Sequence, residues 1–217
     1  GTRVAARCGV GSTYQPLKQV FTDAGFTEIR HSFRMMIDLD TPPPAPVWPD
    51  GITVRAAVMG QDDRAVLQVQ RDSFSDHWGY VEEPFEDNLK RWLHQWQAEG
   101  DFDPSLWFLA MDGDTIAGIA LCKPHLGGQE DVGWVSTLGV TRAYRQRGIG
   151  LALLHQAFGE YYRRGLKQVG LGVDAGSLTG AVRLYEQAGM RVAVQFDLYE
   201  KELRAGRDIT RQELNQE

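Results

Sequence analysis

Apolar residues recur along residues 52–204 at spacings that predict alternating strands and helices. The clearest helical stripe follows Pro84, a residue that suits the start of a helix, and it ends at Gly100. Its members are Phe85, Leu89, Trp92, Leu93 and Trp96. Further helices are predicted over Asp62–Phe74, from about Gly148 to Gly165, and over Leu178–Ala188. Strands are predicted over Ile52–Ala56, Leu106–Met111, Thr115–Cys122, Val132–Val140, Val169–Val173, Arg191–Val194 and Phe196–Leu203.

A proline-rich segment divides the chain. Residues 41–51 hold five of the nine prolines, and proline locks φ and lacks an N–H donor. This segment is therefore predicted to be an extended linker between residues 1–40, which we call the head, and a main domain over residues 52–204. Residues 205–217 form a polar tail.

The head repeats the order of elements at the end of the main domain. Each reads strand, Gly-Ser, helix, Ala-Gly and strand, with an offset of 164 residues that aligns Gly25 with Gly189 and Leu39 with Leu203. This pattern favours a repeat over a chance similarity. The head is then the last part of a first copy whose beginning is missing, and Gly1 is not the native start.

Composition narrows the possible functions. The chain has 217 residues, 42% of them hydrophobic, and 23 Lys and Arg against 29 Asp and Glu, for a formal net charge of -6. These values are ordinary for a globular protein and argue against nucleic-acid binding, which needs a basic face. No apolar run approaches the ~18–20 residues of a membrane span. Cys8 and Cys122 lack metal-ligand spacing, so no metal is expected, and the lack of a signal-peptide pattern predicts a cytoplasmic protein.

A basic turn after the strand Val132–Val140 carries the strongest chemical signal. Arg145, Arg147, Gly148 and Gly150 stand where a helix begins. Free N–H groups and the positive end of the helix dipole attract anions there, and glycine lets a phosphate approach closely. A solvated basic turn without a ligand is the plain alternative.

Two motifs relate the chain to a known family. Arg145-x-x-Gly148-x-Gly150 resembles the coenzyme A pyrophosphate loop of the GNAT acetyltransferase superfamily, and residues 180–190 resemble that family's Ala-x-x-Leu-Tyr-x-x-x-Gly-Phe segment. Met190 replaces the usual Phe. The resemblance implies an α/β (α+β) fold in which a mixed, mostly antiparallel sheet has helices on both faces, with a partial second repeat at the N-terminus. This arrangement resembles tandem-domain GNAT enzymes such as mycothiol synthase, with the first repeat truncated.

The resemblance also implies a role for individual residues, with acetyl-CoA as co-substrate. The backbone of Leu138, Gly139 and Val140 would pair with the pantetheine arm, and the N–H of Leu138 would polarise the thioester carbonyl. Tyr185 would protonate the departing thiolate, unless it is a core tyrosine with a satisfied hydroxyl. Phe21, at the matching position of the head, cannot donate a proton. The pyrophosphate would lie on Arg145, Gln146, Arg147, Gly148, Ile149, Gly150 and Leu151.

The acceptor site is weakly marked. Asp76, His77 and Trp78 follow the first helix of the main domain, where this family usually shapes the acceptor pocket, although a structural role for His77 is as good a reading. Glu130 and Asp131 lie over ~20 Å before Leu138 along a straight strand, so they are poor bases, and a relayed water is favoured. Acidic residues near the first two helices of the main domain could attract a cationic amine.

These observations predict an N-acyltransferase that moves an acetyl group from acetyl-CoA to a primary amine of a small molecule by direct attack. The alternative is a non-catalytic acyl-CoA-binding sensor or scaffold. A mycothiol-synthase-like or antibiotic-modifying enzyme would differ only in its acceptor. The head is too small to bury its apolar residues alone, so we expect it to dock on the main domain or on the head of a second chain as a homodimer.

Overall fold

The computed structural model describes residues 1–98, 100, 102–176 and 180–210. In this part of the chain, eight strands form one sheet in the order β1-β8-β2-β7-β6-β5-β4-β3. Each neighbouring pair is antiparallel except β6 and β7, which are parallel. The sheet is therefore mixed and mostly antiparallel, as predicted. The elements are β1 (Val4–Gly11), α1 (Gln15–Asp23), β2 (Thr27–Asp38), β3 (Ile52–Ala56), α2 (Asp63–Phe74), α3 (Phe85–Gln97), β4 (Trp107–Asp112), β5 (Thr115–Lys123), β6 (Val132–Val140), α4 (Ile149–Arg163), β7 (Gln168–Asp174), α5 (Ala181–Gln187) and β8 (Arg191–Arg204).

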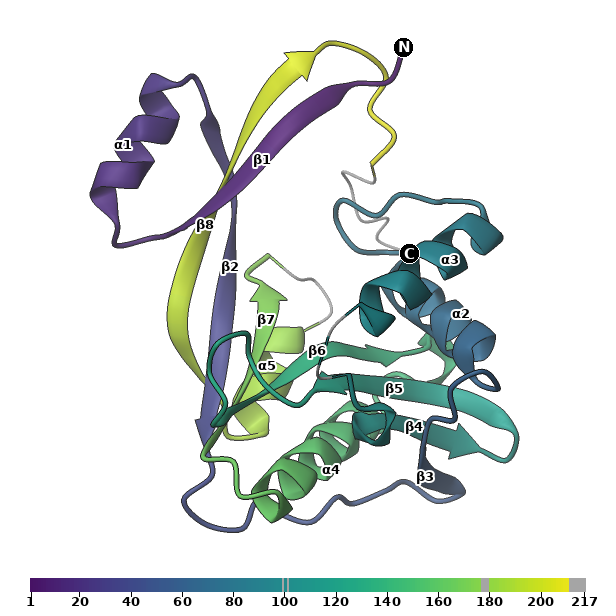
Figure 1. Ribbon diagram of the computed structural model, residues 1–217. Helices are drawn as coiled ribbons and strands as arrows, with labels where there is room; N and C mark the ends of the chain where they lie inside the picture. The colour runs from purple at the N-terminus through teal and green to yellow at the C-terminus, as the bar shows by residue number, and fades with distance from the viewer. Residues whose placement is uncertain (99, 101, 177–179, 211–217) are drawn as a thin grey trace.

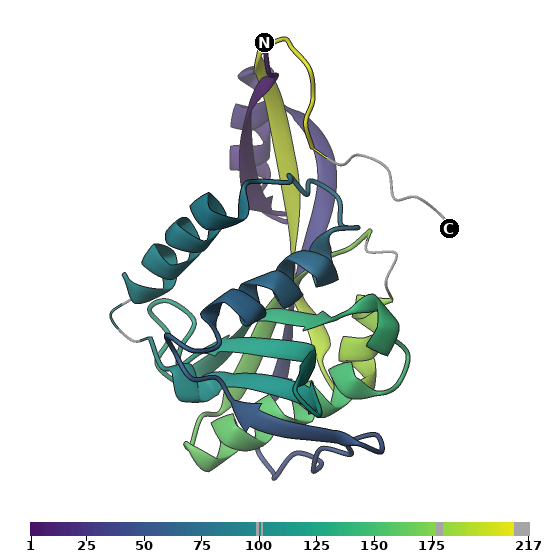
Figure 2. The ribbon, with the colours of Figure 1, turned by 90° about the vertical axis from the view of Figure 1, so that its right-hand side faces the viewer.

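Helices cover both faces of the central strands. α2 and α3 lie on one face, and α4 and α5 lie on the other (Figures 1 and 2). Each face has its own core. Trp92 and Trp96 of α3 pack on Trp107 of β4 on the first face, whereas Leu153 and Phe158 of α4 are fully buried on the second. The apolar stripe after Pro84 thus faces the sheet, as its spacing predicted.

The head is built into the sheet. β2 lies between β7 and β8, and β1 pairs with the other side of β8 (Figure 1). The head therefore docks on the main domain of its own chain, which is one of the two arrangements that the sequence left open. Figure 2 shows β1, β2 and β8 rising together out of the body, with α1 beside them.

The prediction of two final strands is wrong. Arg191–Val194 and Phe196–Leu203 belong to the single strand β8. β2 pairs with residues 191–200 of β8 and β1 pairs with residues 196–204, so the strand stays hydrogen-bonded along its length. β2 lies between β8 and β7.

Three of the six bounds that the head and the end of the main domain share follow the offset found in the sequence. β1 begins at residue 4 and β7 at 168, α1 ends at 23 and α5 at 187, and β2 begins at 27 and β8 at 191. These three pairs of bounds each differ by 164 residues, whereas the starts of α1 and α5, the ends of β1 and β7, and the ends of β2 and β8 differ by 166, 163 and 166 residues. The pairing is crossed, because β1 pairs with β8 and β7 pairs with β2.

Helix ends differ from the prediction by a few residues. Pro84 is the residue before α3 rather than its first residue, and α3 ends at Gln97, before Gly100. α5 begins at Ala181, whereas the predicted start at Leu178 lies outside the described residues.

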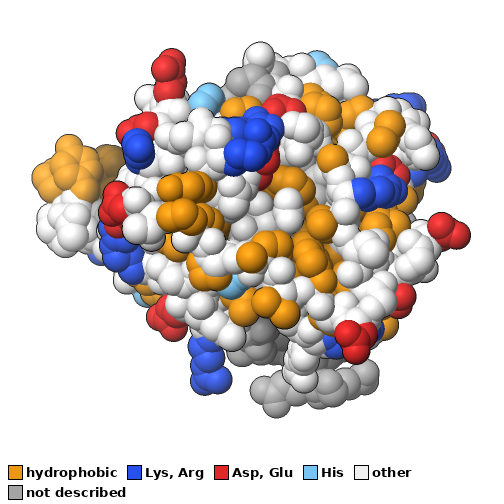
Figure 3. Space-filling model, turned by 90° about the horizontal axis from the view of Figure 1, so that it is seen from below, with side chains coloured by type: hydrophobic (Ala, Val, Ile, Leu, Met, Phe, Trp, Pro, Cys, Tyr) orange, Lys and Arg blue, Asp and Glu red, His pale blue; other side chains and the backbone are white. Residues whose placement is uncertain are grey.

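The helices and the surface charges bear on two classes of function, membrane insertion and nucleic-acid binding. None of the helices in the described ranges has the length and apolar character that crossing a bilayer requires. On the face seen from below, basic side chains stand in small groups among acidic and apolar ones (Figure 3). This face therefore presents no broad basic surface of the kind that nucleic acid would need.

Candidate functional site

β6 parts from β7 halfway along its length. Val132–Val135 pair in parallel with Gln168–Leu171, and the pairing stops there, whereas β6 stays paired with β5 as far as Val140. At the same point the register with β5 shifts, so that Ser136 is the extra residue of a β-bulge. Within the described sheet, residues 136–140 therefore have no strand on their β7 side. Backbone groups along this edge can bind an extended ligand as an added strand would, although the carbonyl of Val140 accepts a hydrogen bond from Nε of Arg145.

The three residues predicted to hold the pantetheine arm lie in this unpaired part. Leu138 stands opposite Ala120 of β5, and its side chain packs on the core beneath α4. A Cβ on Gly139 would come within 2.9 Å of the Cβ of Ser73, so only glycine lets α2 approach β6 this closely. The strand is thus fixed on both faces while its edge stays open.

The turn after β6 has the backbone of an anion site. Gln146, with a φ of 61°, is the non-glycine residue in the left-handed region among those described, and Gly148 has a φ of 86°. Such strain is typical of ligand-binding turns. No side chain caps the N-terminus of α4, so its first N–H groups remain open to a ligand. Gly150 lets α5 approach, because a Cβ there would lie 3.0 Å from Cδ2 of Leu184.

The two arginines of the turn differ in their surroundings. Nη1 of Arg145 donates to Oδ2 of Asp76 at 2.7 Å, and its Nη2 donates to the carbonyl of Ser73 at 3.0 Å. Its Nε donates to the carbonyl of Val140 at 3.2 Å. Arg145 thus ties the turn to α2 and β6. Arg147 is exposed, and the structure places its guanidinium 5.2 Å from the ring centre of Tyr144.

Tyr144 fixes the first part of this turn. Its hydroxyl donates to the carboxylate of Asp112 at 2.9 Å, which links the turn to the end of β4. Because the side chain of Arg145 is held by its hydrogen bonds and that of Arg147 is exposed, Arg147 is better placed to reach a phosphate. The role of the turn as a whole stays a prediction.

The predicted acceptor residues lie in the loop after α2, and each has a partner. Burial raises the pKa of Asp76, but the hydrogen bond and charge of Arg145 outweigh it, so the net pKa lies below its usual value. Burial lowers the pKa of His77, whose imidazole is therefore neutral at pH 7 and packs edge-on against Phe74 with ring centres 4.7 Å apart. The indole of Trp78 lies under two arginines of the head. An acceptor role for the three residues stays a prediction.

Tyr185 lies in α5 with 8% of its surface exposed. Burial raises its pKa to about 12, so the phenol keeps its proton at pH 7 and is a weaker acid than an exposed tyrosine. Its hydroxyl makes no hydrogen bond to any residue that the structure describes. The burial of the ring fits a core tyrosine as well as a catalytic one, so the role of Tyr185 as an acid stays a prediction.

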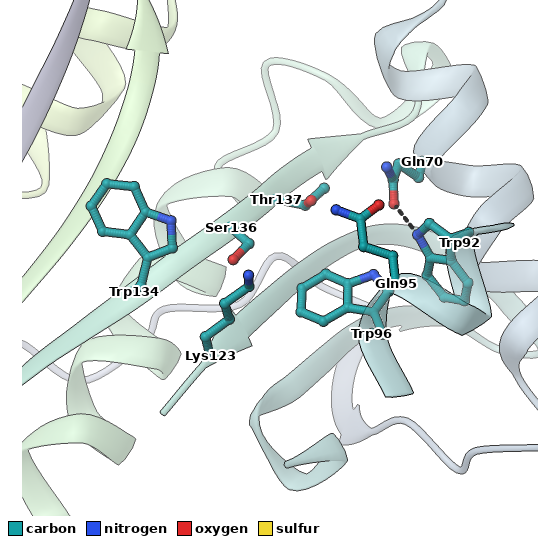
Figure 4. Close-up of a pocket in the computed structure, with 8 residues that line it drawn as sticks. All are labelled: Gln70, Trp92, Gln95, Trp96, Lys123, Trp134, Ser136 and Thr137. Carbon is teal, nitrogen blue, oxygen red and sulfur yellow. Dashed lines mark hydrogen bonds between the residues drawn. The ribbon is translucent and has the colours of Figure 1, made fainter. Parts of the chain in front are cut away.

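A polar pocket of about 290 Å³ opens between the bulge of β6 and the helices α2 and α3 (Figure 4). Its described lining contains Lys123 and no carboxylate, and gives no support to a cationic acceptor. Nε1 of Trp92 donates to Oε1 of Gln70 at 3.0 Å, which leaves the amide NH₂ of Gln70 as a donor. The hydroxyl of Ser136 is buried and forms no hydrogen bond with the residues that the structure describes. The lining residues are Gln70, Trp92, Gln95, Trp96, Lys123, Trp134, Ser136 and Thr137.

Sequence reasoning did not single out this pocket. Trp92 and Trp96 were interpreted as core positions, which they also are, and Gln70, Gln95 and Lys123 carried no signal. These residues come from α2, α3 and β5. No spacing along one element could show that they meet.

Comparison with known proteins identifies the family of this chain. The family model described as "Acetyltransferase (GNAT) family" matches residues 64–190. A mycothiol acetyltransferase of Thermobispora bispora is 36% identical over 76% of this chain and 55% of the relative, and one of Streptomyces scabiei is 35% identical over 88% and 58%. The crystal structure of a GCN5-related N-acetyltransferase from Sphaerobacter thermophilus is 40% identical, with a TM-score of 0.79 over 95% of this chain and 62% of that one. The chain thus spans just over half the length of these curated relatives, and it belongs to the GNAT acetyltransferase family.

Proposed function

We propose that this protein moves an acetyl group from acetyl-CoA to a primary amine of a small molecule by direct attack. The observation that carries the proposal is the open edge of β6 at residues 136–140, with an uncapped helix N-terminus at one end and a polar pocket at the other. A thioester held along this edge would have its acyl group near the bulge. The pocket gives an amine access to the same point.

The backbone supplies most of the proposed cofactor site. Leu138, Gly139 and Val140 would pair with the pantetheine arm, and the N–H of Leu138 would stabilise the oxyanion. The N–H groups of residues 146–151, together with the side chain of Arg147, would hold the pyrophosphate. Arg145 would act by holding the turn, because its hydrogen bonds go to Asp76, Ser73 and Val140.

The chemistry follows from these groups. A neutral amine attacks the thioester carbonyl, the tetrahedral intermediate collapses, and the thiolate leaves with the proton of Tyr185. A water takes the proton of the attacking amine, since no carboxylate lines the described pocket, and solvent returns a proton to the phenolate of Tyr185. The hydroxyl of Ser136, buried in the pocket without a partner, would accept a hydrogen bond from the attacking amine.

The substrate of the relatives suggests one acceptor. Two curated relatives are called mycothiol acetyltransferases, so the amine that accepts the acetyl group in mycothiol formation is the first acceptor to test. We also propose that residues 1–40 are the end of a first GNAT repeat, supported by the shared order strand, helix, strand and by offsets of 163 to 166 residues between the bounds of the elements. Residues 52–204 would be the acetyltransferase repeat, and a cytoplasmic location would suit its use of acetyl-CoA.

The deciding experiment is thiol release from acetyl-CoA in the presence of a panel of small amines, with CoA binding measured by calorimetry on the same sample. The proposal requires CoA binding and amine-dependent thiol release. CoA binding without turnover on any amine would favour the sensor or scaffold. No CoA binding would contradict both.

A further inference from the structure

Trp78 joins the main domain to the head. It lies in the loop between α2 and α3, and two guanidinium groups of the head stand over its indole. That of Arg7 in β1 is 4.6 Å from the ring centre, and that of Arg30 in β2 is 4.9 Å away. These distances are those of cation–π contacts.

The two arginines are themselves fixed. Nε of Arg7 donates to Glu200 of β8 at 2.7 Å, and Arg30 forms an ion pair with Asp174 at the end of β7. Arginine that is already held in an ion pair loses little further freedom on stacking. The guanidinium groups of Arg7 and Arg30 are therefore held in fixed positions, against which the indole of Trp78 packs.

Asp76, two residues before Trp78 in the same loop, contacts the turn that follows β6. Asp76 accepts from Nη1 of Arg145 at 2.7 Å and lies 3.6 Å from Nη2 of Arg142. Its side chain is 17% exposed, so the pair is partly shielded from solvent. The short segment Asp76–Trp78 thus contacts the turn with one residue and the head with another.

We propose that Trp78 is a positioning residue, through which the head sets the loop after α2 and, by way of Asp76 and Arg145, the turn that receives coenzyme A. The inference rests on the proposed function of that turn. It gives the head a task in cofactor binding although none of the predicted cofactor residues lies in it. Coupling of this kind runs through a contiguous chain of contacts, and each contact here can be removed separately.

The test is a double-mutant cycle read by calorimetry with coenzyme A as the probe. Trp78→Leu keeps an apolar side chain but removes the aromatic face, and Trp78→Phe is the matched control that retains it. Trp78→Leu should weaken CoA binding by about fivefold, whereas Trp78→Phe should stay close to the unmodified chain. In an Asp76→Asn background, which already lacks the charged link to Arg145, Trp78→Leu should have no further effect on CoA affinity.

A purely structural role gives a different result. Trp78→Leu would then lower the melting temperature in both backgrounds without changing CoA affinity, or would weaken CoA equally in both, and either result overturns the inference. If Trp78→Leu does not fold, the pair Arg7→Gln and Arg30→Gln removes the cations instead and should give the same fivefold loss. If the unmodified chain binds no CoA, the proposed function fails. If it binds CoA and the cycle shows no coupling, only the role of Trp78 fails.

Discussion

The guanidinium of Arg145 and the carboxylate of Asp76 form a charged pair, 2.7 Å between Nη1 and Oδ2, that joins the turn after β6 to the end of α2. Both side chains are largely buried, 27% and 17% exposed. Removing one partner of such a pair leaves the other charge without compensation. The two arginines of the turn should therefore respond differently to substitution.

We expect Arg145→Ala to lower the free energy of unfolding by about 2 kcal/mol, because Asp76 keeps only the more distant Arg142, 3.6 Å away, as a cation and two carbonyls lose a donor. Arg147→Ala, at an exposed position in the same turn, should change stability by less than about 0.5 kcal/mol but weaken CoA binding. Chemical denaturation and calorimetry on both variants provide the measurement. The opposite pattern would show that Arg145, not Arg147, reaches the phosphates.

Gly148 tests the anion site itself. Gly148→Asn and Gly148→Asp have nearly the same shape, and both residues tolerate the left-handed backbone found there, with a φ of 86°. The Asp variant adds a negative charge at the mouth of the helix and should bind CoA at least ~10-fold more weakly than the Asn variant, as measured by calorimetry. Equal affinities for the two variants would mean that no phosphate lies near this residue.

Much of the fold could be predicted because it depends on local signals. The bounds of β6 match the prediction at both Val132 and Val140, and the helix after it begins at Ile149, next to the predicted Gly148. Hydrophobic spacing and glycine placement act within a few residues, so the sequence alone displays them. The final strands were mispredicted because strand β8 is held by partners from the other end of the chain.

The site was predictable only where it is built from one segment. Residues 138–151 are contiguous, and their backbone could be anticipated from the motif. The pairing of Arg145 with Asp76 joins residues 69 positions apart, and the pocket gathers side chains from α2, α3, β5 and β6. Contacts between distant segments depend on how the elements pack, which no local spacing encodes.

Tyr185→Phe should lower turnover by up to ~10²-fold with little change in CoA affinity, since it removes a proton donor but keeps the ring. Because the pKa of Tyr185 is raised to about 12, the phenol stays protonated through neutral and mildly alkaline pH. The pH–rate profile should thus show no alkaline loss from this group below about pH 11. Tyr199→Phe, which removes a hydroxyl bound to Glu28 in the head, is the control and should keep full turnover. Unchanged turnover in Tyr185→Phe would mean that the thiolate leaves without this acid.

Asp197 of β8 makes the head sensitive to acid. It is 2% exposed, and its carboxylate is bound by Lys18 at 2.6 Å, Ser12 at 2.5 Å and His31 at 3.0 Å. Burial raises the pKa of Asp197, but these hydrogen bonds outweigh it and hold the pKa far below the usual 3.8. A lowered pKa in the folded state contributes stability above the unfolded-state pKa, and that contribution is lost as the pH falls below it.

Melting temperatures measured between pH 7 and pH 2 should therefore fall at the acid end, with a smaller fall in Asp197→Asn, which has no proton to gain. At pH 7 the free energy of unfolding of Asp197→Asn should be lower than that of the unmodified chain by about 2–4 kcal/mol. A parallel acid loss in both proteins would assign the pH dependence to other carboxylates.

Removal of residues 1–50 is the strongest test of how the head is integrated. Because β2 lies between β7 and β8, a shortened chain would lose the strand that pairs with both. β7 would keep only β6 as a neighbour, and β8 would keep none of its present partners. Exposed edges of this kind promote association, so the shortened chain should aggregate or associate in light scattering. CoA binding should be lost with the fold, although the cofactor residues 138–151 remain. If the shortened chain aggregates because β7 and β8 lack their strand partners, adding residues 1–50 as a separate peptide should restore its solubility. A soluble, monomeric shortened chain with unchanged CoA affinity would show that β8 can pair with β7 directly and that the head is dispensable.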